Sequence, residues 1–129
     1  MTPELIYLVW SAVLTVVLAA IAVGGATLEV GLPRLAGNRE HMPEMSSWAG
    51  RAARAHRNML ENLVLFAILV LTARAANISN AMTVLGAQIF FWARVAHAGL
   101  YIAGIAWLRT AAWLVSIAGL ALIAWQLVR

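Results

Sequence analysis

The first stretch of the chain, from Leu5 to Leu28, carries no charged residue and is long enough to cross a lipid bilayer as a helix. A bilayer core about 30 Å thick needs roughly 20 predominantly apolar residues. The stretch also exceeds the apolar region of a cleaved signal peptide, so we expect a retained span. The whole chain is 64% hydrophobic and 11% charged, whereas soluble domains average about 45–50% apolar and about 25% charged residues. The sequence therefore predicts an integral membrane protein.

Three further segments can span the bilayer. The second must extend the apolar run Asn62–Thr72 backward through charged residues, and the third and fourth run from Ala81 to Tyr101 and from Thr110 to Val128. Short connections after the second and third segments make neighbouring helices antiparallel. The predicted fold class is an all-α membrane protein, an up-down-up-down bundle of four transmembrane helices in a single domain. The expected helices cover residues 4–28, 47–74, 80–103 and 108–128, with a cytoplasmic loop over 29–46.

The nine basic residues are all arginines, and most stand toward one end of the predicted bundle. Only Arg74 and Arg129 mark the opposite end. The arginines around the first loop and the third connection are Arg34, Arg39, Arg51, Arg54, Arg57, Arg94 and Arg109. Cytoplasmic connections carry the excess of arginine in membrane proteins. We therefore expect both termini to lie away from the cytoplasm, in an inner or plasma membrane.

Charge and cysteine content exclude several functions. The net charge is +4, but the arginines are few and separated by apolar runs, so no nucleic-acid partner is expected. No cysteine is present, which excludes disulfides, thiolate metal ligands and a cysteine nucleophile. Any thiol chemistry must use the sulfur of a ligand. A metal site is not expected either, because the histidines lack the close spacing to another ligand that zinc sites use.

The segment leading into the second span places four polar residues on one helical face. Arg54, Arg57, Asn58 and Glu61 follow one another at i, i+3, i+4 and i+7. One interpretation is an interfacial belt, in which the arginines reach lipid phosphates and Glu61 pairs with Arg57 or Arg54. A carboxylate on the membrane side of such a cluster is costly, by about 2.5–3.5 kcal/mol. Glu61 is therefore expected to face a partner or a wet cavity.

The third span carries a second polar set, Arg94, His97 and Tyr101, at i, i+3 and i+7 on one face. Tyr101 could simply be an aromatic residue at the membrane interface, and His97 could make an interhelical hydrogen bond. Arg109 and Thr110, at the start of the fourth span, could be an anchor and an N-cap. Together with the second-span residues they instead suggest a cytoplasmic-side pocket rich in guanidinium. Such groups bind carboxylates bidentately, which favours a small anionic or zwitterionic ligand.

Two of these segments resemble the motifs of a known family. RAHRNMLEN closely resembles the second-helix signature of the MAPEG family, the membrane-associated proteins of eicosanoid and glutathione metabolism. RVAHAGLY resembles the family's third-helix signature R-x-x-H-x-x-x-Y. The two motifs stand in the family's order, and the four expected helices cover the whole chain.

The resemblance implies a homotrimer that binds glutathione between neighbouring subunits near the cytoplasmic side. The implied glutathione contacts are Arg54, Arg57, Asn58, Glu61, Arg94, His97 and Tyr101. An arginine at the start of the fourth helix, followed by a hydroxyl residue, stabilises the glutathione thiolate in catalytic members, and Arg109 with Thr110 is the nearest match. Its spacing from Tyr101 is one residue shorter than in the prostaglandin E synthase branch.

The resemblance predicts a glutathione transferase or peroxidase that acts on lipophilic small molecules arriving through the membrane lipid. Two other functions are considered. One is a non-catalytic, lipid-binding scaffold, as in the lipoxygenase-activating members of the family. The other is a small four-helix transporter, although that class carries a glutamate in the middle of its first span and the segment from Leu5 to Leu28 has none.

Overall fold

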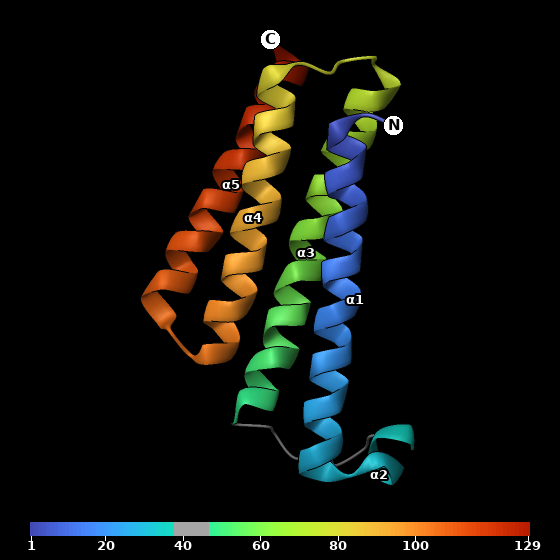
Figure 1. The fold of residues 1–129 in the computed structure, drawn as a ribbon, viewed down its shortest axis with the longest axis vertical. Coiled ribbons are helices and arrows are strands. Elements are labelled where there is room, and N and C mark those ends of the chain that lie inside the picture. Colours follow the sequence, from blue (N-terminus) through green and yellow to red (C-terminus); the bar gives the residue numbers. More distant parts are fainter. Residues whose placement is uncertain (38–46) are drawn as a thin grey trace.

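The computed structural model describes residues 1–37 and 47–129, and four long helices contain most of them. The helices are α1 (Pro3–Val30), α3 (Trp48–Ala75), α4 (Ala81–Ala103) and α5 (Ala106–Val128), with a short α2 (Leu32–Ala36) after the first. Successive long helices run in opposite directions (Figure 1). No strand occurs in the described ranges. The predicted all-α up-down-up-down bundle is confirmed.

The connection after α1 differs from the expected plain loop over 29–46. Helix α1 continues to Val30, and α2 follows after Gly31. Gly31 has a φ of 85°, a backbone conformation that glycine adopts without steric cost. Pro33 then lies in the first turn of α2, where its fixed φ suits a helix start. The rest of the expected loop, residues 38–46 with Arg39, lies outside the described residues.

Local capping chemistry sets the ends of α4. At its start, Asn80 accepts hydrogen bonds from the backbone N–H groups of Met82 and Thr83, and the Thr83 hydroxyl accepts from the Asn80 N–H. This is a reciprocal capping box. At its end, Gly104 has a φ of 82° and its N–H bonds to carbonyls of the last turn. Only Gly104 and Ile105 join α4 to α5. The C-terminal end of α4 therefore lies next to the N-terminal end of α5.

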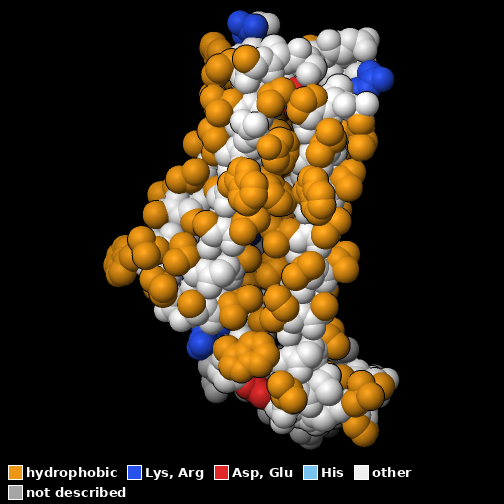
Figure 2. Space-filling model, in the orientation of Figure 1, with side chains coloured by type: hydrophobic (Ala, Val, Ile, Leu, Met, Phe, Trp, Pro, Cys, Tyr) orange, Lys and Arg blue, Asp and Glu red, His pale blue; other side chains and the backbone are white. Residues whose placement is uncertain are grey.

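Three of the described helices, α1, α3 and α5, are long and apolar enough to cross a membrane. Helix α4 is as long as α5, but Gln88, Arg94 and His97 lower its mean hydropathy. Arg94 and His97 are buried, so neither polar group lies on the outer side of α4. The face in Figure 2 is covered largely by hydrophobic side chains, and charged ones lie near its two ends. This distribution fits a bundle surrounded by lipid.

The bundle consists of two helix pairs, α1 with α3 and α4 with α5, and the pairs meet through α4 (Figure 1). The rings of Phe66 and Phe90 stack at the centre, with centroids 4.1 Å apart. Helices α4 and α5 cross where Gly86 and Gly119 face each other, because a Cβ added to either would lie 2.7 or 2.6 Å from the other's carbonyl oxygen. Helix α5 contacts α3 much less. Its position is therefore set mainly by α4.

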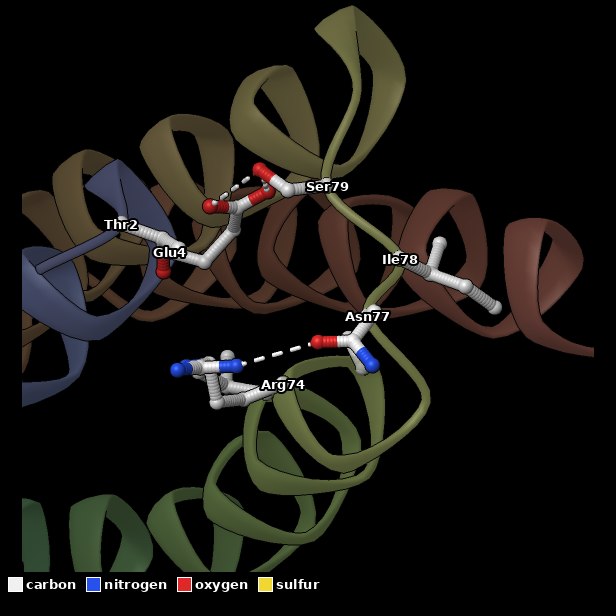
Figure 3. A pocket seen from close by; sticks show the side chains of 8 residues that line it. Thr2, Glu4, Arg74, Asn77, Ile78 and Ser79 are labelled. Atoms are coloured by element: carbon white, nitrogen blue, oxygen red, sulfur yellow. Dashed lines mark hydrogen bonds between the residues drawn. The ribbon is translucent and has the colours of Figure 1, made fainter.

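A buried carboxylate ties the start of α1 to the α3–α4 connection (Figure 3). Glu4 is 2% exposed, and both of its oxygens accept from the Ser79 hydroxyl, at 2.9 and 3.1 Å. The Thr83 hydroxyl also donates to it. The carboxylate thus lies at the N-terminal end of α4, where the helix dipole favours negative charge. Arg74 and Asn77 line the same pocket of about 140 Å³, at the end of the bundle remote from the sequence-predicted site.

Candidate functional site

The contact between α3 and α4 contains a buried arginine, Arg94. Arg94 is 1% exposed, and its Nη2 donates to Asn58 Oδ1 at 2.6 Å. Its Nε and Nη1 have no hydrogen-bond partner. No carboxylate pairs with it in the part of the chain that the structure describes. Burying a charge is costly unless it is paired, and Arg94 keeps two N–H groups without a partner among the described residues.

His97 and Tyr101 continue the same face of α4. His97 is 3% exposed, and its ring lies edge-on to that of Tyr101, with centroids 5.5 Å apart and an interplanar angle of 64°. The Nδ1 atom of His97 is buried and has no hydrogen-bond partner within residues 1–37 and 47–129. The interpretation of His97 as a satisfied interhelical hydrogen bond is therefore wrong for this nitrogen. This nitrogen, like Nε and Nη1 of Arg94, lies at the contact between α3 and α4.

The tight Gly104 turn folds the start of α5 back onto the end of α4. The guanidinium carbon of Arg109 consequently lies 4.3 Å from the centroid of the Tyr101 ring, a cation–π geometry. Thr110 donates its hydroxyl to the Ala106 carbonyl at 3.2 Å. Helix α5 begins at Ala106, with Ile105 as its N-cap. The alternative interpretation of Thr110 as an N-cap is therefore wrong, and both residues stand within the first helical turns.

A pocket of about 160 Å³ opens where α3, α4 and α5 meet. It is lined by Asn58, His97, Tyr101, Arg109, Thr110 and Trp113. The lining offers an amide, an imidazole, a phenol, a guanidinium and a hydroxyl, but no carboxylate. Arg94 lies directly behind Asn58, so its positive charge adds to the potential of the pocket. Such a donor-rich site suits an anionic group.

The remaining sequence-predicted residues do not join this pocket within one chain. Arg54, Arg57 and Glu61 are exposed on α3 and make no ion pair or hydrogen bond with residues 1–37 or 47–129. The pairing of Glu61 with Arg57 or Arg54, which the interfacial-belt interpretation included, is thus not formed there. Leu60 and Val64, on the same helix, are exposed as well. The charged stripe thus lies beside exposed apolar residues on the outer side of α3.

Three residues near the pocket were not among the predicted site residues. Asn62 is 6% exposed, and its amide nitrogen donates to the Asn58 carbonyl and side-chain oxygens. Its i+4 spacing from Asn58 was the available signal. Trp113 forms part of the pocket wall, one turn after Arg109. Arg51 donates through Nε to the Ile102 carbonyl at 2.8 Å, which anchors the start of α3 to the end of α4.

Comparison with known proteins gives one family. A family model described as "MAPEG family" matches residues 5–129, which is nearly the whole chain. Neither the curated proteins nor the solved structures contain a match. The matched range includes all of the residues that line the pocket.

Proposed function

The chain belongs to the MAPEG family, whose members are integral membrane proteins of glutathione and eicosanoid metabolism, and from this premise we propose that it binds glutathione. The proposed site is the pocket between α3, α4 and α5 together with the exposed stripe of α3. The proposed activity is that of a glutathione transferase or peroxidase acting on lipophilic electrophiles.

One observation carries the proposal: the unpartnered donors of buried Arg94. Among the residues that the structure describes, this guanidinium has one hydrogen bond and no counter-ion. A buried charge in that state lowers stability. A guanidinium is also the side chain best suited to bidentate binding of a carboxylate. Glutathione carries two carboxylates, so it would supply the missing negative charge.

The size of the pocket supports a ligand that extends beyond a single chain. Pockets for drug-sized ligands measure about 300–1,000 Å³, and this pocket measures about 160 Å³. A tripeptide would therefore place only part of itself there. We propose that the rest contacts the exposed stripe, with Arg54 and Arg57 facing a carboxylate and Glu61 facing the ammonium group. A homotrimer would provide the cover for that stripe.

The chemistry would take place at the start of α5. Bound glutathione supplies the sulfur nucleophile, which a chain without cysteine lacks. Positive charge beside a thiol lowers its pKa and favours the thiolate. Arg109 is the proposed source of this charge, because its guanidinium is held over the Tyr101 ring at the edge of the pocket. The Thr110 hydroxyl, next to it, is the proposed second donor.

The site would lie on the cytoplasmic side. The pocket is formed at the end of the bundle that carries the α1–α3 connection and the α4–α5 turn, and both termini lie at the other end (Figure 1). Arg51, Arg54 and Arg57 gather at the site end, as cytoplasmic ends of membrane proteins do. We therefore propose an inner or plasma membrane location with both termini away from the cytoplasm.

The first expected result is saturable binding of glutathione by the wild-type protein. Calorimetry in lipid nanodiscs should give a single class of site. The diethyl ester of glutathione, whose carboxylates are blocked, should bind at least about 10-fold more weakly, because each lost charged hydrogen bond costs about 1.5–3 kcal/mol. Equal affinity for the two compounds would contradict carboxylate recognition by the arginines.

A lipid-binding scaffold is the second candidate function, and a groove between α1 and α4 favours it. The groove measures about 680 Å³ and is lined mainly by apolar and aromatic side chains, among them Trp10, Phe91 and Trp92. Its size suits a lipophilic molecule. A folded protein that binds a fluorescent fatty acid but no glutathione would favour the scaffold over the enzyme.

The second expected result concerns Arg109. Arg109→Leu should lower kcat by about 100-fold, the usual effect of losing one stabilising group for a developing anion. The dissociation constant for glutathione should change by less than about 3-fold, because Arg94 and the α3 stripe remain. Turnover of an aryl halide measures kcat, and calorimetry measures the dissociation constant. Arg74→Leu removes the same charge at the far end of the bundle and should leave both constants unchanged. An unaltered kcat in Arg109→Leu would refute thiol activation by this residue.

A further inference from the structure

Asn62 is a buried residue on α3 that the proposed function does not use. It lies one helical turn after Asn58, away from the pocket lining. We propose that Asn62 is a positioning residue: it fixes the side-chain amide of Asn58, so that Asn58 offers only N–H donors to a ligand. The identity of the ligand rests on the proposed function. The fixed orientation of the Asn58 amide, called the locked amide below, does not.

The hydrogen bonds of Asn58 are unevenly divided between its two amide atoms. Its Oδ1 accepts from Arg94 Nη2 at 2.6 Å and from Asn62 Nδ2 at 3.3 Å. A carbonyl oxygen has two lone pairs, so this oxygen has no capacity left. The Nδ2 atom of Asn58 has no partner among residues 1–37 and 47–129. Because Asn58 lines the pocket, the free N–H groups are what it can offer there.

Asn62 is itself held in one orientation. The same Nδ2 that reaches Asn58 Oδ1 also donates to the Asn58 backbone carbonyl at 2.9 Å. Turning the Asn62 amide over would lose both bonds. Turning the Asn58 amide over would bring its NH₂ group against two donors, Arg94 and Asn62. Arg94 Nη2 would then lose its acceptor in a buried place, and Asn62 would keep only its bond to the Asn58 backbone carbonyl. The three side chains therefore support one arrangement.

This arrangement determines which end of a ligand can approach Asn58. A free N–H pair beside buried Arg94 donates to a carboxylate or a peptide carbonyl, and it repels an ammonium group. The ammonium end of a zwitterion is thereby directed toward Glu61, which is exposed on the same helix. Asn62 would thus set the polarity with which a zwitterionic peptide enters the site, although Asn62 does not touch it.

A double-mutant cycle on glutathione affinity tests the inference. Asn62→Leu should weaken binding by about 10-fold, because the Asn58 amide is no longer held in the orientation that donates a hydrogen bond to the ligand. Asn58→Ala should weaken it by a similar factor. In the Asn58→Ala background, Asn62→Leu should add less than about 2-fold, because Asn62 acts through Asn58. Asn62→Gln, which keeps an amide donor on a longer side chain, should recover most of the loss. Independent losses that multiply in the double mutant would overturn the inference.

A second measurement needs no glutathione. In protein labelled with ¹⁵N-asparagine in detergent micelles, the side-chain amide signal of Asn58 is identified by its absence in Asn58→Ala. It should be narrow and distinct in the wild type, and shifted or broadened in Asn62→Leu. A wild type that binds no glutathione but gives this result would refute the proposed function and support the locked amide. An Asn58 signal that is the same in both proteins would refute the locked amide, whatever glutathione does.

Discussion

Gly119→Ala is expected to separate α4 from α5 and to lower the free energy of unfolding by about 3 kcal/mol, at the upper end of the usual cost of overpacking. The new Cβ would lie 2.6 Å from the Gly86 carbonyl oxygen and 2.8 Å from the Phe90 nitrogen. Both are backbone atoms, so a rotamer change cannot relieve the contact. Turnover should fall as well, because Arg109 moves with α5. Thermal unfolding in nanodiscs and an activity assay measure the two effects.

Two other helical glycines provide matched controls. A Cβ added to Gly24 or Gly99 meets nothing within 4 Å. Alanine at either position should therefore keep the fold and stabilise the helix by up to about 1 kcal/mol, the difference in helix propensity. If Gly119→Ala melted at the same temperature as Gly99→Ala, the close crossing of α4 and α5 would be disproved.

Arg94→Met should have opposite effects on stability and on binding. The methionine fills much of the same buried space without a charge, so the free energy of unfolding should stay equal or rise by about 1–3 kcal/mol. Glutathione affinity should fall by about 100-fold, because the ligand loses the charged hydrogen bonds of a guanidinium. Thermal unfolding and calorimetry on the same preparation separate the two effects.

Arg74→Met serves as the control for that substitution. Arg74 is exposed, and its one side-chain hydrogen bond goes to Asn77 at 3.3 Å. Its replacement should change neither melting temperature nor affinity. A marked loss of stability in Arg94→Met would mean that Arg94 serves the fold, and an unchanged affinity would remove it from the binding site.

The architecture could be predicted because bilayer thickness translates directly into segment length. The apolar runs predicted the helices, and the short connections predicted that successive helices run in opposite directions. The spacing of Arg94, His97 and Tyr101 also identified a common face of α4, and the structure places that face toward α3 and α5. Periodicity within one helix was sufficient there, because all three residues share that helix.

Other features depend on contacts between distant segments, which periodicity does not encode. The spacing of Arg54, Asn58 and Glu61 put them on one stripe, but it could not tell that Asn58 alone turns toward α4. The burial of Glu4 by Ser79 depends on residues far along the chain, and so does the crossing of Gly86 with Gly119. The family resemblance, not the spacing, supplied glutathione and the trimer.

Helix α5 is held most closely at its crossing with α4, and Arg109 lies several turns away from that point on the same helix. Ten residues separate Gly119 from Arg109 (119 − 109), a distance of about 15 Å at 1.5 Å per helical residue. A tilt of about 4° at the glycine pair therefore displaces the Arg109 backbone by about 1 Å. Packing at the glycine pair, several turns away from the pocket, therefore influences where the Arg109 guanidinium lies.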